Sequence, residues 1–154
     1  MGQRYKKIVA ENRKARFDHH IFESYEAGIV LRGNEVKSLR IGRVNLRDSF
    51  VRIENGQAVL FGMHISPYDF ARKEGAEPLR NRKLLLSRSE IRKLAGKVSQ
   101  KGFVLIPLRV YFSGNFAKIE IALAKGKKQY DKKETIKKKD SERDMERELV
   151  DRQR

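Results

Sequence analysis

Cysteine is absent from the 154 residues, and long apolar runs are scarce. Without cysteine, the chain can form no disulfide, thiolate metal site or cysteine nucleophile. No segment approaches the ~20 consecutive apolar residues that a membrane helix needs. The first 16 residues, MGQRYKKIVAENRKAR, also lack the apolar core of a signal peptide. We therefore expect a cytoplasmic protein with no membrane partner.

Acidic residues are much fewer than basic residues. The chain has 36 Lys and Arg against 20 Asp and Glu, a formal charge of +16 at pH 7. This excess is opposite in sign to a phosphate backbone and larger than solubility requires. Residues 1–125 hold 25 of the basic and 12 of the acidic groups, so most of the excess lies upstream of the highly charged end. Nucleic acid is therefore the leading class of partner.

Short runs with the alternation of β-strands dominate the middle of the chain. Two of them flank Asn55-Gly56, whose tolerance of left-handed backbone suits a tight hairpin. Two more, residues 103–112 and 116–124, are separated by a Ser-Gly-Asn turn. Five or six such strands predict a mainly β fold, a small closed antiparallel barrel of the oligonucleotide-binding (OB) type.

Two stretches carry helical signals. Asn34 is expected to cap a short helix over residues 35–42. Ser87 and Glu90 have the spacing of a capping box and precede an amphipathic stripe, so a second helix is expected before Gly102. The expected barrel therefore carries two or three helices and a charged C-terminal tail.

The chain is expected to have three parts. Residues 1–11 are predicted to be a flexible basic N-terminal arm, residues 12–130 the OB-like RNA-binding barrel, and residues 131–154 a tail. The tail has too few sizeable apolar residues to hold it on a core, so we expect it to be disordered when free. It has no proline or glycine, and its opposite charges recur three or four residues apart, so it should become helical when bound.

Catalytic chemistry has little support in the sequence. Adjacent His19 and His20 should point to opposite faces of a strand, and with His64 they match no zinc or metalloprotease spacing. The enzyme alternative is a small nuclease that uses His64 or His19 with Glu26. We expect no catalytic residue, metal or cofactor, and surface or structural roles for the three histidines.

Basic side chains gather in three clusters that predict a phosphate-binding surface, although clusters of this kind can also be solvated faces. The clusters are Lys37, Arg40, Arg43 and Arg47; Arg80, Arg82, Lys83 and Arg88; and Lys125, Lys127 and Lys128.

Glu26 is unusual because it is a carboxylate in an otherwise apolar run. It is either an exposed strand position or an acceptor for donors on bases or 2′-hydroxyls. Several aromatic residues could stack on bases, or could instead be half-buried packing residues. They are Tyr5, Phe17, Tyr68, Tyr111 and Tyr130.

Four segments together resemble the family of SsrA-binding proteins (small protein B) of bacterial trans-translation. They are YEAGIVLRGNEVKSLRIGRVNLRDSFV (25–51), RKLLLSRSEIRKL (82–94), GFVLIPLRVYF (102–112) and ALAKGKKQYDKKE (122–134). The resemblance covers most of residues 12–134, and it implies an OB barrel that binds the tRNA-like domain of transfer-messenger RNA (tmRNA). Such a protein is an adaptor for ribosome rescue rather than an enzyme. The alternative is a generic structured-RNA-binding or ribosome-associated barrel protein.

The resemblance also implies further partners. The tail would enter the empty messenger channel of a stalled 70S ribosome and meet small-subunit rRNA, and elongation factor Tu would be an indirect partner through alanyl-tmRNA. One departure from the family pattern concerns Phe17, which stands where a histidine commonly follows the Lys-Ala-Arg triplet. Stacking by Phe17 is a possible substitute for a histidine hydrogen bond.

The resemblance and the basic clusters together give the candidate site residues. Those expected to bind RNA are Asn12, Lys14, Glu26, Lys37, Arg40, Arg82, Lys83, Lys118, Lys125, Lys127 and Lys128. Those expected to contact the ribosome through the tail are Tyr130, Asp131, Lys132, Lys133, Ile136, Lys137, Lys138 and Lys139. Among them, Glu26 matches the acidic RNA-contacting residue of the family.

Overall fold

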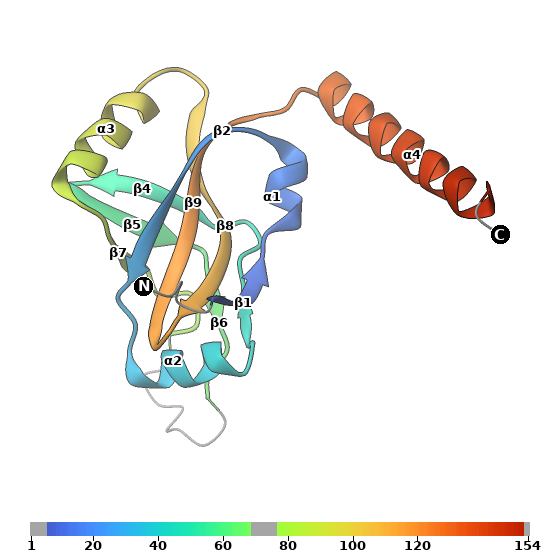
Figure 1. Ribbon diagram of the computed structural model, residues 1–154. Helices are drawn as coiled ribbons and strands as arrows, with labels where there is room; N and C mark the ends of the chain where they lie inside the picture. Colours follow the sequence, from blue (N-terminus) through green and yellow to red (C-terminus); the bar gives the residue numbers. More distant parts are fainter. Residues whose placement is uncertain (1–5, 69–76, 153–154) are drawn as a thin grey trace, which may run out of the picture.

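The computed structural model describes residues 6–68 and 77–152, and these are mainly β (Figure 1). The strands are β1 (Lys6–Glu11), β2 (His19–Ile29), β3 (Val44–Asn45), β4 (Phe50–Glu54), β5 (Gln57–Phe61), β6 (His64–Ile65), β7 (Arg82–Leu85), β8 (Phe103–Ser113) and β9 (Phe116–Gly126). The helices are α1 (Arg13–Asp18), α2 (Gly33–Arg40), α3 (Arg88–Val98) and α4 (Gln129–Arg152).

Antiparallel pairing joins the larger strands into a ring in the order β8, β4, β5, β7, β2, β9 and back to β8. One edge of β8 is shared: Leu105 pairs with Val51 of β4, whereas the stretch from Arg109 to Ser113 pairs with β1. The short strands β3 and β6 form a separate pair. The predicted mainly β architecture is confirmed, and it takes the form of this ring of strands.

The long strands β8 and β9 are buried on both faces. Ile119, Ile121 and Leu123 point into the ring and belong to its main core. The intervening Ala122 and Ala124 lie on the opposite face, where Ala15 of α1 packs on them together with residues of β8. Burial on both faces explains why the second half of β9 is almost continuously apolar in sequence.

Two local predictions are confirmed. The hairpin between β4 and β5 turns at Asn55 and Gly56, whose φ angles are +50° and +71°. Ser87 caps α3, because its hydroxyl accepts a hydrogen bond from the N–H of Glu90 at 3.2 Å. Capping satisfies an N–H that would otherwise have no partner in the first turn, so the helix starts at a defined residue.

The predicted flexible arm is wrong for residues 6–11, which form β1 and pair with β8. Val9 and Ala10 pack against the main core, a small apolar contribution that the surrounding charges hid in the sequence. Residues 1–5 of the predicted arm lie outside the described residues. The predicted cap of α2 is also wrong: the helix begins at Gly33, and the backbone N–H of Arg32 donates to Oε1 of Glu35 at 2.8 Å.

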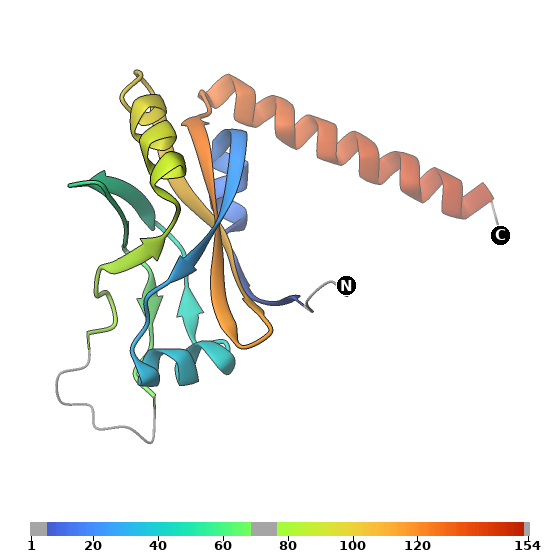
Figure 2. The ribbon, with the colours of Figure 1, turned by 60° about the vertical axis from the view of Figure 1, so that its left-hand side comes forward.

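The tail forms α4, which projects away from the ring in both views (Figures 1 and 2). It begins at Gln129, two residues before the predicted boundary. That this segment becomes ordered only on binding stays a prediction. None of the described helices combines the length and the apolar composition needed to cross a membrane, and α4 itself is strongly charged.

Candidate nucleic-acid interface

Glu26 lies on the outer face of the sheet formed by β2, β9, β8 and β1. Its Oε2 accepts a hydrogen bond from the hydroxyl of Tyr111 and is 3.7 Å from Nζ of Lys6. Nζ of Lys6 also lies 5.2 Å from the centre of the Tyr111 ring. Within the described part of the chain, these contacts reach only Oε2, so Oε1 is available to a donor on a ligand.

The hydroxyl of Tyr111 is a dependable donor to Glu26. Burial raises the pKa of this phenol, and the hydrogen bond to the Glu26 carboxylate raises it further. The phenol therefore stays protonated at any physiological pH and fixes the position of the carboxylate. The Glu26 side chain remains 46% exposed, which leaves it accessible to RNA.

Further charges of both signs surround Glu26 on this face. Glu120 is its direct neighbour across the β2–β9 pair, and its Oε2 is 2.5 Å from Nε of Arg109. The same carboxyl group is 3.8 Å from the guanidinium of Arg16 on α1. Glu120 is therefore neutralised within the protein, whereas Glu26 keeps one oxygen free, so the two neighbouring carboxylates are not equivalent as acceptors.

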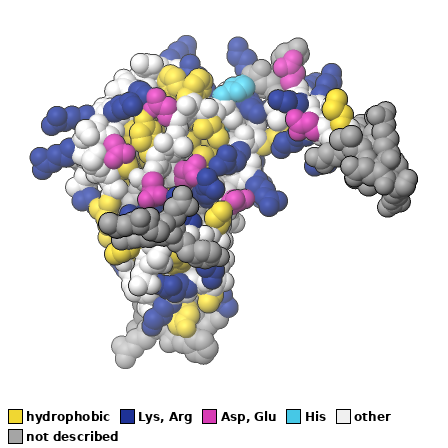
Figure 3. Space-filling view, in the orientation of Figure 1, with side chains coloured by type: hydrophobic (Ala, Val, Ile, Leu, Met, Phe, Trp, Pro, Cys, Tyr) yellow, Lys and Arg dark blue, Asp and Glu magenta, His cyan; other side chains and the backbone are white. Residues whose placement is uncertain are grey.

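The predicted basic residues do not form one continuous surface. Lys37 and Arg40 lie on α2, at the end of the ring opposite the junction with α4 (Figure 1). Lys125 and Lys127 lie at the other end, where β9 leads into α4. Figure 3 shows Lys and Arg side chains spread over the body and along α4, with Asp and Glu side chains between them.

The remaining predicted basic residues are also divided between the two ends of the ring. Lys83 is exposed on β7, and Lys118 is half-buried opposite Tyr111 near the start of β9. Lys14 is exposed on α1, and Lys128 is exposed just before α4. RNA that contacts both groups must therefore span the length of the body.

Asn12 is buried and has a structural role instead of the predicted RNA contact. Its Oδ1 accepts the N–H of Ala15 at 3.2 Å and so caps α1. Its side-chain amide donates to the carbonyls of Leu46 and Pro107, each at 3.2 Å. These bonds join α1, β8 and the segment after β3, and they use both N–H donors of a side chain that is buried away from any RNA.

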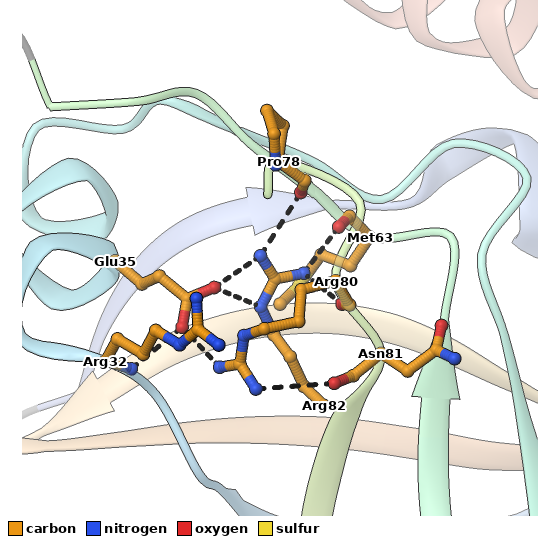
Figure 4. Close-up of polar contacts among 7 residues, drawn as sticks. All are labelled: Arg32, Glu35, Met63, Pro78, Arg80, Asn81 and Arg82. Carbon is orange, nitrogen blue, oxygen red and sulfur yellow. Dashed lines mark hydrogen bonds and ion pairs between the residues drawn. The ribbon is translucent and has the colours of Figure 1, made fainter. Parts of the chain in front are cut away.

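Arg82 is likewise inside the protein, with its side chain 1% exposed, so the prediction that it contacts RNA is wrong. Its Nε and Nη2 lie 2.7 and 2.5 Å from Oε2 of Glu35 on α2. It also donates to the backbone carbonyls of Met63, Arg80 and Pro78 (Figure 4). A buried guanidinium needs this many acceptors because an unsatisfied buried charge is very costly.

Glu35 is the anionic centre of this group, and Arg80 completes it at 2.5 Å from Oε1. Burial by itself raises the pKa of the Glu35 carboxyl, but the hydrogen bonds from Arg80, from the N–H of Arg32 and from Arg82 outweigh it and lower the pKa below its ordinary value. Glu35 is therefore ionised at neutral pH. The pairing attaches α2, with its basic residues, to the segment before β7.

α4 is attached to α1 at its first turns. The N–H of Lys127 donates to the backbone carbonyl of Asp18 at 2.8 Å, and Nζ of Lys132 is 3.2 Å from the Asp18 carboxylate. The Nζ atoms of Lys127 and Lys139 lie 6.0 and 5.9 Å from the centre of the Phe17 ring. Phe17 therefore lies beside lysines before and along α4 instead of presenting an isolated stacking surface.

The other predicted tail residues are distributed along α4. The side chains of Lys133, Lys137 and Lys138 are exposed, and Ile136 is 47% exposed. The side chains of Tyr130 and Asp131 lie outside the described ones. The structure therefore presents these three lysines to solvent on a helix, as contact with a polyanion would require.

Comparison with known proteins supplies the family. The family model for the SmpB protein matches residues 9–151, nearly the whole chain. The chain belongs to the SmpB family. It is 59% identical over 143 residues to the SsrA-binding protein of Carboxydothermus hydrogenoformans. That alignment covers 93% of this chain and 96% of the relative. The SsrA-binding protein of Halothermothrix orenii is 56% identical over 154 residues, 100% of this chain and 99% of that protein.

A solved structure gives the same result. The chain is similar to one in a structure described as "tmRNA-SmpB: a journey to the center of the bacterial ribosome", with a TM-score of 0.67 and 47% sequence identity. The match covers 82% of this chain and 93% of that chain. The family resemblance read from the four sequence segments is therefore confirmed.

Sequence reasoning missed some surface residues of this SmpB-family chain. Lys6 was assigned to a flexible arm, so its place beside Glu26 was not expected. Phe22 was not among the predicted site residues, but a bulge between Ile21 and Glu23 shifts the register of β2 on β9, and Phe22 is 55% exposed. A bulge of this kind has no clear sequence signal, although the mixed alternation around Phe22 is consistent with one.

Proposed function

We propose that this SmpB-family chain binds the tRNA-like domain of tmRNA and delivers it to stalled ribosomes for trans-translation. The full-length family match carries the proposal, and the likeness to a chain in a tmRNA-SmpB structure supports it. The ring of strands would be the OB-type barrel of the family. The chain would act as a cytoplasmic adaptor without catalysis, with elongation factor Tu as an indirect partner through alanyl-tmRNA.

The geometry supports recognition of a folded RNA by shape and phosphate contacts. The interior of the ring is filled by its own apolar side chains, so only the outer faces and the loops can bind a ligand. The outer face offers a fixed acceptor, Oε1 of Glu26, flanked by the cations of Lys6 and Lys118. An acceptor set among cations can take a hydroxyl or amino donor while the cations hold the backbone.

Selective binding is the direct test. We expect the full chain to bind the isolated tRNA-like domain at least about tenfold more tightly than an unrelated hairpin RNA of equal length, a difference of about 1.4 kcal/mol. Fluorescence anisotropy at a fixed salt concentration would measure both affinities. Equal affinities would favour the generic structured-RNA-binding alternative, and cleavage of either RNA during the assay would favour the nuclease alternative.

Glu26 should matter as an acceptor. Because a glutamine keeps one acceptor oxygen and an alanine has none, Glu26→Gln should weaken binding of the tRNA-like domain less than Glu26→Ala, which should cost roughly 1–3 kcal/mol. Anisotropy titrations give the affinities, and circular dichroism shows whether each variant is folded.

Glu54→Ala is the matched control, because Glu54 is an exposed carboxylate at the end of β4. It should leave the affinity unchanged or slightly higher, since it removes a negative charge from the surface. If Glu26→Ala binds the RNA as tightly as the unmodified chain, Glu26 is only an exposed strand residue.

A further inference from the structure

Two aromatic rings and a lysine from three adjacent strands come together at the end of the ring near α4. Phe22 lies on β2, Lys125 on the central strand β9, and Phe103 on β8 directly opposite Lys125. The two rings meet edge to face, with centroids 5.3 Å apart and planes inclined by 70°. We name Phe22, Lys125 and Phe103 the aromatic row.

The aromatic row has an accessible apolar surface. Phe22 is 55% exposed, whereas Ile21 and Val104, 38% and 40% exposed, are both in register with Ala124 and so lie on the other face of the sheet from Lys125 and Phe103. Figure 3 shows hydrophobic side chains gathered over the upper ends of β2, β8 and β9, with Lys and Arg side chains beside them. Single exposed apolar residues are common, but a largely exposed phenylalanine that packs on a second ring and lies beside a lysine indicates a contact surface.

The charge next to the rings is positive. Nζ of Lys125 lies 4.4 Å from the Phe103 centroid and 6.0 Å from the Phe22 centroid. Within the described part of the chain, no carboxylate pairs with Lys125. The nearest acid along β2, Glu23, is instead held by Lys97 and Tyr25. The ammonium of Lys125 is therefore free to meet a phosphate.

A groove borders the aromatic row on the side of β4. The β4–β8 pairing consists of Val51 opposite Leu105, and the groove beside it is lined by β4 from Phe50 to Glu54 and by Phe103 to Leu105 of β8. Arg52 lies on the β4 side of this groove, with its guanidinium 5.1 Å from the centre of the Phe50 ring. The groove and the row together give a partly apolar surface with a cation on each side.

We propose that the aromatic row is a stacking site for an unpaired RNA base, with Phe22 as the platform and Lys125 on the adjacent phosphate. This proposal rests on the proposed function only because it takes the ligand to be RNA. Unpaired bases stack on exposed aromatic side chains, and neighbouring cations neutralise the backbone that joins them. This row would contact a single-stranded segment of the RNA, away from the Glu26 face.

A pair of substitutions separates stacking from general hydrophobic contact. Phe22→Leu keeps an apolar side chain but loses the ring, whereas Phe22→Tyr keeps the ring. For a fluorescein-labelled oligouridylate of eight nucleotides, we expect about tenfold weaker binding for Phe22→Leu and less than about twofold change for Phe22→Tyr. Thermal unfolding followed by circular dichroism would establish that both variants are folded.

An oligonucleotide of equal length with abasic sites is the matched probe. It keeps the phosphates but has no bases to stack, so Phe22→Leu and the unmodified chain should bind it with equal affinity. Lys125→Gln should weaken binding of both probes and reduce the slope of log affinity against log salt by about one.

Three results would overturn the proposal: equal oligouridylate binding by Phe22→Leu and the unmodified chain, parallel losses on both probes for Phe22→Leu, or no oligouridylate binding at all. The unmodified chain should be tested in parallel with the tRNA-like domain. Retained binding of that domain would leave the proposed function intact while the stacking site fails, so the two failures are distinguishable.

Discussion

A chain that ends at Lys128 should bind the tRNA-like domain within about twofold of the full chain and yet fail to support tagging on stalled ribosomes. The cut removes α4 but keeps β9 and the hydrogen bond from Lys127 to Asp18. Most of the excess positive charge lies upstream, and electrostatic attraction to phosphates follows that charge. The measurements are RNA anisotropy and incorporation of the tag in a reconstituted translation system.

The lysines of α4 are the expected cause of the loss of tagging. Its first half is basic and its second half is mainly acidic, so only the first half suits a channel lined with rRNA phosphates. Alanine at five lysines together should therefore reproduce most of the loss in the full-length chain. These are Lys132, Lys133, Lys137, Lys138 and Lys139.

A control removes positive charge from the body instead. Alanine at Arg92, Lys93 and Lys101, which are exposed on α3 and the loop after it, should leave tagging close to normal at saturating RNA. Normal tagging by the chain that ends at Lys128 would contradict the mechanism and would leave the tail as a solubilising segment.

The fold was predictable where local chemistry is strong. The Asn55-Gly56 turn and the Ser87 capping box each depend on a few neighbouring residues, and both are present in the structure. β1 was missed because its stability comes from pairing with β8, about 100 residues away, and not from its own sequence, half of which is charged. Long-range pairing has no signature within a short window of sequence.

The candidate site residues were likewise predictable only in part. Glu26 was recognisable as a carboxylate in an apolar strand, and the structure exposes it. Asn12 and Arg82 are polar residues whose types gave no sign of burial, and only the tertiary structure surrounds them with partners. A basic residue in a sequence cluster can therefore be either exposed or buried. On β7, Lys83 is exposed and could contact a ligand, whereas its neighbour Arg82 is a buried structural cation.

Replacing Glu35 by alanine should lower the free energy of unfolding by about 3–5 kcal/mol, because it leaves the buried guanidinium of Arg82 without its counter-ion. Chemical denaturation at pH 7 would measure the loss. The control is Glu120→Ala, which breaks a Glu–Arg pair whose arginine is 37% exposed, and it should cost less than about 1 kcal/mol. A similar cost for both variants would mean that burial of Arg82 adds nothing to the pair.

The pH dependence gives a second measurement of the same pair. The folded protein holds the pKa of Glu35 below its ordinary value of 4.5, so the folded state binds fewer protons than the unfolded state in this range. The contribution of Glu35 to stability is therefore complete above about pH 4.5 and is lost as the pH falls through the lowered pKa. Glu35→Gln should lack this part of the acid destabilisation.

Removing the Arg82 charge together with Glu35 tests why the single substitution is costly. Glu35→Met with Arg82→Met replaces this ion pair by apolar side chains, and the double variant should be more stable than Glu35→Met alone, because the fully buried guanidinium of Arg82 is no longer left unpaired and only the partly exposed Arg80 loses its partner. The pair also connects α2 to the segment before β7. Lys37 and Arg40 should therefore keep their positions only in variants that keep this connection or replace it by apolar packing. RNA affinity should accordingly fall in Glu35→Met and recover in the double variant. If the double variant is no more stable than Glu35→Met, then loss of shape, rather than an unpaired guanidinium, accounts for the effect.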